Sequence, residues 1–189
     1  MVTSNFKFIG GALCVDFLNT VGGRAGGRPL RDKFARPYDL TRWCEQAGLS
    51  REPGISTRVL HRAVTLREAL FRICRALLDQ RAPSSGDVRT LNRELALART
   101  QERLRYTRRG FELEADPGVL GQVARSAADL LTSERSGRLR QCGDDECGWM
   151  FLDTSRNGSR RWCQMKICGN RAKARNFRKR LLRSAAQAR

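Results

Sequence analysis

Four of the seven cysteines lie within 27 residues near the end of the chain, and they constrain its fold more than any other feature. They form two pairs with the same internal spacing, Cys142 with Cys147 and Cys163 with Cys168. Two close pairs of thiols are typical of a tetrahedral Zn²⁺ site made of four thiolates. Such a site leaves no position for an activated water, so the sequence predicts one structural zinc ion.

Other states of the cysteines remain open from the sequence. An iron–sulfur cluster also takes four cysteines, and four thiols without a metal are a further alternative. A disulfide framework is disfavoured because the count is odd and no secretion signal is visible at the N-terminus. The isolated Cys14, Cys44 and Cys74 fall on apolar faces, where we expect small core residues.

The sequence around the cysteines predicts tight turns and a short hairpin. Gly143 and Gly148 follow the first two cysteines, where turns around a metal favour positive φ. Trp149 and the Asn-Gly turn at 157–158 predict a hairpin between the two cysteine pairs. For a module of about 50 residues, metal binding would supply folding energy on the order of 10 kcal/mol.

A basic helix is expected after Cys168. Residues 154–189 contain 12 basic and no acidic residues, out of 37 basic and 19 acidic residues in the chain, whose net charge is +18. So concentrated a charge attracts a polyanion, either nucleic acid or an anionic membrane, although a basic helix can also be a solvated face. One apolar stripe is expected on this helix: Ala174, Phe177, Leu181 and Ala185.

We expect the nucleic-acid contacts to come from the basic and amide side chains in and before this helix. Arginine and lysine suit phosphates, and Asn170 and Arg171 also suit base edges. Asn170 could equally cap the helix, and Arg171 could brace the zinc loop. The candidate nucleic-acid-binding residues are Arg160, Arg161, Asn170, Arg171, Lys173, Arg175, Arg178 and Lys179.

The rest of the chain predicts a mainly α fold with a small β component, an α+β class. A polar, turn-rich segment at 132–137 divides it into an α-rich domain, residues 1–135, and a zinc module of knuckle, hairpin and basic helix, residues 138–189. The segment 22–29 is expected to be a flexible loop. Helices are expected near 13–21, 39–48, 57–81, 88–99 and 116–132, with a strand at 6–9 and a hairpin at 103–108 and 111–115.

The segment 57–81 has the strongest helical pattern and is predicted to be the central core helix. Leu70, Ile73 and Leu77 share one face and are expected to be buried. Glu68 and Arg72 stand four residues apart in the order that favours an ion pair. Ser85 or Asp87 is the expected cap of the helix that follows.

Two segments resemble known families. Residues 163–171, with the core Cys-Gly-Asn-Arg at 168–171, resemble the signature of the CGNR zinc finger family. Residues 10–20 and 66–70 are similar to the ABATE domain, described as a stress-induced transcription regulator, which accompanies this finger. The resemblance covers essentially the whole chain and implies zinc binding and DNA binding.

The sequence therefore predicts a DNA-binding transcription regulator. The finger would contact nucleic acid, most simply duplex DNA, while the N-terminal domain senses a small-molecule effector or mediates assembly. An RNA- or ribosome-associated protein is the first alternative. An enzyme with a site in the N-terminal domain is disfavoured, because His61 is the only histidine and no catalytic motif is visible. Lacking a signal peptide or a long apolar stretch, the protein is expected in the cytoplasm, away from membranes.

Overall fold

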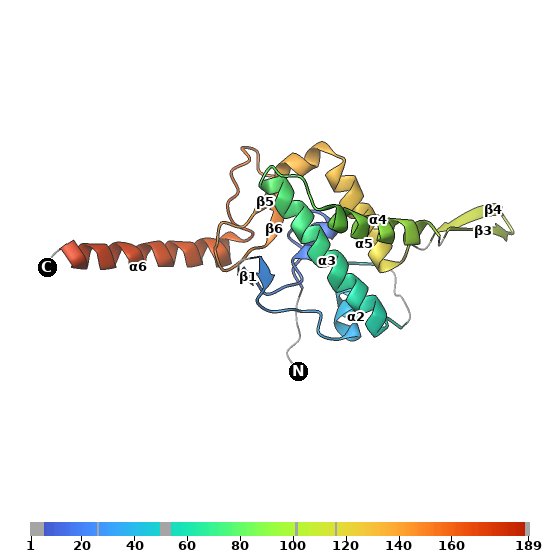
Figure 1. Ribbon diagram of the computed structural model, residues 1–189, viewed down its shortest axis with the longest axis horizontal. Helices are drawn as coiled ribbons and strands as arrows, with labels where there is room; N and C mark the ends of the chain where they lie inside the picture. The colour runs from blue at the N-terminus through green and yellow to red at the C-terminus, as the bar shows by residue number, and fades with distance from the viewer. Residues whose placement is uncertain (1–5, 26, 50–53, 101, 116, 188–189) are drawn as a thin grey trace.

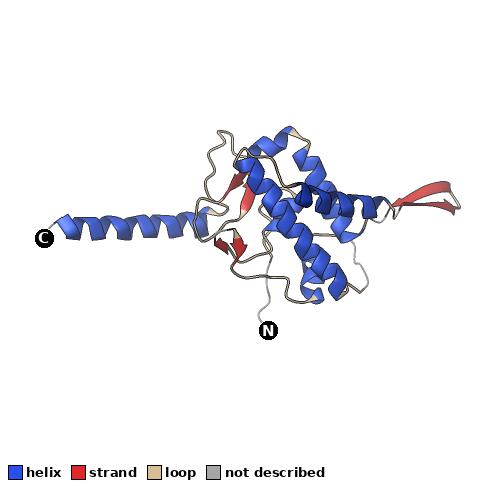
Figure 2. Ribbon diagram, in the orientation of Figure 1, coloured by secondary structure: helices blue, strands red, loops and turns tan. Residues whose placement is uncertain are grey.

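The helix α3 (Thr57–Leu78) is 22 residues long and forms the centre of a helical body in this computed structural model (Figure 1). The structure describes residues 6–25, 27–49, 54–100, 102–115 and 117–187. It is mainly helical with small antiparallel sheets, which confirms the predicted α+β class (Figure 2). Four helices pack around α3: α1 (Leu13–Leu18), α2 (Pro37–Gln46), α4 (Ser85–Arg99) and α5 (Gly118–Leu131).

Apolar burial holds this body together. Trp43 of α2 is fully buried, and its ring packs edge-on against Phe17 of α1 with centroids 5.1 Å apart. Leu70 and Ile73 of α3 are buried as predicted. The prediction for Leu77 is wrong, because its side chain is 39% exposed in the last turn of α3.

Ion pairs on α3 differ from the local pattern expected. Glu68 contacts Arg24 at 2.7 Å and Arg67 at 2.9 Å, whereas Arg72 contacts Asp87 of α4 at 2.6 Å. The predicted Glu68–Arg72 pair is therefore replaced: Glu68 pairs with Arg24 and with the adjacent Arg67, and Arg72 pairs with Asp87 of α4.

The capping prediction for α4 is wrong by one residue. Ser84 is the N-cap, and its hydroxyl accepts a hydrogen bond from the Gly86 N–H at 3.2 Å. Asp87, one of the two expected caps, is instead the carboxylate that binds Arg72 from α3.

Two N-terminal expectations also need correction. Residues 6–9 form no strand, because no neighbouring strand pairs with them in the described chain, yet Phe6 is buried. The expected loop at 22–29 contains the short strands β1 (Arg24–Ala25) and β2 (Arg28–Pro29), which pair antiparallel. Its anchor is Arg24, a buried side chain held by Glu68.

The predicted hairpin between α4 and α5 is confirmed. Strand β3 (Glu102–Thr107) pairs antiparallel with β4 (Gly110–Ala115) along their whole length. The hairpin projects beyond the helices at one end of the molecule (Figure 1).

The C-terminal module begins with the 3₁₀ helix η1 (Glu134–Arg138) and the strands β5 (Leu139–Gln141) and β6 (Met150–Leu152). These strands pair with each other, so the hairpin encloses the first cysteine pair rather than lying between the two pairs. The expected hairpin at 157–158 is only a turn, because no strand flanks it. Leu139, Met150 and Leu152 are buried in the core of the helical body, so this core crosses the predicted domain boundary.

The chain then forms the π-helical turn η2 (Met165–Gly169) and the helix α6 (Asn170–Gln187). Helix α6 projects from the body at the end opposite to the β3–β4 hairpin (Figure 1). On its expected apolar stripe Ala174 is exposed and Phe177 is 59% exposed, so the described part of the chain leaves this region of the stripe largely uncovered. The side chains of Leu181 and Ala185 lie outside those described.

Candidate metal centre and nucleic-acid interface

The four clustered cysteines converge from three segments. Cys142 and Cys147 lie in the loop between β5 and β6, Cys163 lies in the loop that follows β6, and Cys168 lies in η2. All four are buried, and their Sγ atoms lie within 4.8 Å of one another. These four cysteines can hold one zinc ion.

The distances between sulfur atoms fit a tetrahedral ion. Cys163 Sγ lies 3.5 Å from both Cys147 Sγ and Cys168 Sγ. A tetrahedron with Zn–S bonds of about 2.3 Å has edges of about 3.8 Å, whereas a disulfide needs about 2.05 Å. Because all four ligand positions would be filled by protein, such a site is structural.

Hydrogen bonds among the thiols shift their pKa values in different directions. Hydrogen bonds from Cys147 and Cys163 lower the pKa of Cys142. The hydrogen bond to Cys142 raises the pKa of Cys147 to about 12 and raises that of Cys163 as well. A cluster without metal therefore keeps most of its protons, and a divalent cation releases them by binding the thiolates.

Close backbone approaches shape the loop of the first pair. Gly148 has a φ of +65°, as predicted, and a Cβ there would lie 2.8 Å from Cβ of Arg24. Gly143 does not have the positive φ that we expected. A Cβ at this position would lie 3.2 Å from the indole ring of Trp162, so a larger residue would require the ring to shift.

Asp144 joins this loop to α6. Its side chain is buried, and its carboxylate accepts hydrogen bonds from Arg171 Nε at 2.6 Å and from Arg175. Although burial opposes ionisation, the bonds from the two arginines hold the pKa of Asp144 below its ordinary value. Sequence reasoning missed Asp144. The only signal was the acidic run at 144–146, between two cysteines and close in sequence to a basic helix.

Arg171 and Asn170 both make bracing contacts. Arg171 also reaches Glu146 at 3.3 Å, and its Nη2 lies 3.6 Å from Cys168 Sγ. The side-chain amide of Asn170 donates to the carbonyl oxygen of Lys166 at 3.1 Å, within the turn that carries Cys168. Of the two roles left open by the sequence, the contacts of these residues match the brace.

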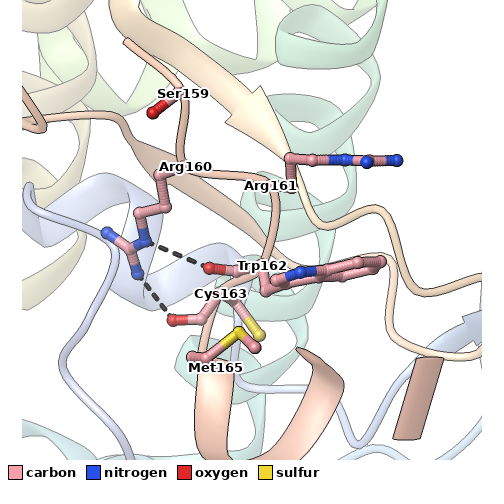
Figure 3. A pocket seen from close by; sticks show the side chains of 6 residues that line it. All are labelled: Ser159, Arg160, Arg161, Trp162, Cys163 and Met165. Carbon is pink, nitrogen blue, oxygen red and sulfur yellow. Dashed lines mark hydrogen bonds between the residues drawn. The ribbon is translucent and has the colours of Figure 1, made fainter. Parts of the chain in front are cut away.

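Arg160 lies against the second cysteine pair. Its guanidinium donates to the carbonyl oxygens of Trp162 at 3.1 Å and Cys163 at 2.6 Å (Figure 3). It also stacks over the ring of Phe151, 4.1 Å from the centroid. Arg161 is exposed and extends away from this cluster on the side of Trp162 (Figure 3). A cavity of about 490 Å³ lies beside this segment and is lined by Ser159, Arg160, Arg161, Trp162, Cys163 and Met165.

The structure thus divides the eight candidate nucleic-acid-binding residues into two groups of four. One group makes contacts that hold the zinc module together: Arg160, Asn170, Arg171 and Arg175. The other group is exposed and has no ion-pair partner among the described residues: Arg161, Lys173, Arg178 and Lys179.

Polar contacts fasten the module to the helical body. The side-chain amide of Asn19 donates to the carbonyl oxygen of Met150 at 2.8 Å and accepts from its N–H at 3.0 Å. Trp149 Nε1 donates to the carbonyl oxygen of Val21 at 2.8 Å. The orientation of the cysteine loop therefore depends on α1 and the segment after it.

The packing of the body encloses two charged side chains, Arg67 and Asp16. Arg67 is fully buried and contacts Asp32 at 2.6 Å. Asp16 of α1 accepts a hydrogen bond from the Gly10 N–H at 2.7 Å, and burial raises its pKa to about 6. Both residues lie on helices, and the packing shows which groups enclose and bind their charges.

These features define a class: a helical domain joined to a four-cysteine zinc finger with a projecting basic helix. Comparison with protein families matches residues 11–134 to ABATE, described as "putative stress-induced transcription regulator", and residues 138–181 to the CGNR zinc finger. The chain belongs to the ABATE family and carries a CGNR zinc finger, as its sequence suggested. A comparison with curated proteins found no match.

Neither family description names an enzymatic activity. Among the helices in the described ranges, none combines the length and the apolar character that a bilayer crossing requires.

Proposed function

We propose that this protein is a DNA-binding transcription regulator whose helix α6 docks on duplex DNA. The zinc ion and its bracing residues hold the start of the helix, and the exposed basic side chains further along contact phosphates. The single observation that carries the proposal is the unbalanced charge of α6, which projects away from the rest of the molecule (Figure 1).

The shape of α6 supports insertion into a groove. Its 18 residues correspond to a helix of about 27 Å, and a helix with side chains fits the B-DNA major groove, about 12 Å wide. Phe177 and Ala174 are exposed, so the body does not cover this side of the helix. No acidic residue between 154 and 189 opposes the approach of phosphates.

The division of the basic residues supports distinct roles. Arg171 and Arg175 form ion pairs with Asp144. We therefore expect these two arginines to set the direction of α6 rather than to neutralise phosphates. Lys173, Arg178 and Lys179 are exposed and have no such partner among the described residues, so we expect each to displace counterions from DNA.

The N-terminal domain would supply regulation. A cavity of about 530 Å³ lies between α3 and the first cysteine loop, with both Arg75 of α3 and Asp144 in its lining. A small polar effector bound there would touch the residue that orients α6. The cavity is therefore our candidate effector site.

Binding of the zinc-loaded full chain to a short DNA duplex across a salt series tests the proposal. With about four phosphates neutralised, the logarithm of affinity should fall against the logarithm of salt with a slope of about −3.5. Arg178→Ala should flatten this slope by about one unit, and the control Arg58→Ala, which removes an equal exposed charge from α3, should not.

An RNA hairpin of equal length serves as the competing ligand. Tighter binding to the RNA would favour an RNA- or ribosome-associated role instead. Equal salt slopes for Arg178→Ala and Arg58→Ala would show that Arg178 of α6 does not contact the nucleic acid. No salt-dependent binding to either nucleic acid would reject the proposal.

A further inference from the structure

One face of the β3–β4 hairpin carries a contiguous group of four apolar side chains. The strand register places Leu104 opposite Leu113 and Tyr106 opposite Phe111, and these residues share a face because side chains two apart point the same way. All four side chains are between 67% and 74% exposed. The Tyr106 and Phe111 rings pack edge-on with centroids 5.0 Å apart. The face is therefore ordered as two side-chain pairs, one aliphatic and one aromatic.

The opposite face of the hairpin is charged and balanced. Arg103 stands opposite Glu114, and Arg105 stands opposite Glu112. Residues 102–115 contain four arginines and three glutamates, a net charge of +1 in a chain of +18. A polyanion is therefore attracted to this hairpin far less than to α6, and two copies can meet here with little repulsion.

The position of the hairpin leaves its apolar face uncovered. It extends beyond the ends of α4 and α5, at the end of the molecule opposite to α6 (Figures 1 and 2). An isolated two-stranded ribbon is marginally stable in water, so an apolar face on such a ribbon gains from being covered.

We propose that this face is a homodimerisation surface whose partner is the same hairpin of a second copy. In a twofold, antiparallel, face-to-face arrangement the aromatic pair of one copy covers the aliphatic pair of the other. The two pairs stand about 7 Å apart along the ribbon, so both contacts form together. This is an isologous contact, in which one surface is complementary to itself. The inference does not depend on DNA binding, and α6 stays free at the far ends.

The buried area fits a reversible dimer. The four side chains expose about 500 Å² per copy, given typical aromatic and leucine areas. Two copies would then bury about 1,000 Å², at the lower end of specific interfaces. The dimer should accordingly form and dissociate with protein concentration.

Sedimentation equilibrium of the zinc-loaded full chain tests the inference. The average mass should rise from the 21.4 kDa of one chain toward twice that value over about 1 to 100 µM, the range expected for a small interface. Tyr106→Ser should weaken the dimer at least about tenfold. Tyr38→Ser is the matched control, because it removes an equally exposed tyrosine from α2, and it should leave the dimer constant unchanged.

Contact mapping completes the test. Both variants change exposed side chains, so circular dichroism and zinc content should match those of the unmodified chain. A photo-crosslinking phenylalanine analogue at position 111 should join hairpin to hairpin. A chain that stays monomeric at the highest concentration would overturn the inference. So would equal weakening by Tyr38→Ser, a crosslink to another surface, or a Tyr106→Ser variant that loses DNA affinity while its mass distribution is unchanged.

Discussion

Helices α3 and α6 are held in place by opposite means. Four helices surround α3, and most of its buried residues are apolar, with leucine the most frequent. Helix α6 is anchored at its first turns, where Cys168 and the contacts of Asp144 with Arg171 and Arg175 attach it to the cysteine loop. The comparison teaches that the body is stabilised by apolar burial, whereas the C-terminal module depends on a metal and on charged braces.

Removing one zinc ligand should have the largest effect. Cys163→Ser should abolish zinc binding and unfold the C-terminal module, because metal binding supplies on the order of 10 kcal/mol in such modules. Leu139, Met150 and Leu152 lie in the core of the body, so its melting temperature should also fall.

Metal analysis and thermal melting check this result. The control Cys74→Ala removes a buried cysteine from α3 and should keep one zinc per chain. Full zinc occupancy in Cys163→Ser would contradict the four-cysteine site. A cooperative melt of the body at an unchanged temperature would mean that the shared core contributes little.

A pair of leucine substitutions tests which part of α3 is buried. Leu70→Ala should reduce the free energy of unfolding by about 2 to 5 kcal/mol through lost burial and a cavity. Leu77→Ala, seven residues further along the same face, should cost less than about 1 kcal/mol because its side chain is 39% exposed. Urea titrations measure both values, and equal costs would show that Leu77 is covered in solution.

The charged brace predicts a smaller and more local effect. Asp144→Asn leaves Arg171 and Arg175 without their carboxylate and should cost about 1 to 2 kcal/mol, since both arginines are partly exposed. Hydrogen exchange should become faster in the first turns of α6 and stay unchanged in α3. The neighbouring exposed residue provides the control, Asp145→Asn, for which we expect no change. Similar exchange in both variants would reject the brace.

The stability of the zinc module and the contribution of Asp16 to the helical body should change with pH in opposite directions. Acid protonates the cysteine thiolates and weakens the zinc module. Asp16 has a pKa raised to about 6 by burial, so its folded form binds a proton more tightly than the unfolded chain. Its contribution to stability is therefore present at low pH and is lost as the pH rises through 6.

Asp16→Asn isolates this contribution. Relative to the variant, the unmodified chain should lose about 1.4 kcal/mol of stability between pH 5 and pH 8, following the titration of one group. Asparagine keeps an oxygen that can accept from Gly10, so the fold should persist. Denaturant titrations at several pH values give the difference, and a difference independent of pH would contradict the raised pKa.

Local sequence patterns predicted the positions of helices and strands well. They predicted poorly which residues these elements contact in the folded chain. The helices at 57–78 and 85–99 and the hairpin at 102–115 follow from periodicity and turn residues, which act over a few residues. The exposure of Leu77, the exchange of Glu68 partners and the position of the module hairpin each depend on a segment distant in sequence. Periodicity carries no information about such segments.

The sequence by itself determined the zinc site and the class of the chain, because ligand identity, spacing and the excess of charge after residue 153 are local properties. Only the tertiary structure decided which basic residues are exposed. Arg160, Arg171 and Arg175 are bound internally because folding brings backbone carbonyls and Asp144 within hydrogen-bond distance, whereas Lys179 meets no such group among the described residues. The net charge of a sequence does not distinguish paired charges from unpaired ones. Only an unpaired charge is available to contact a binding partner.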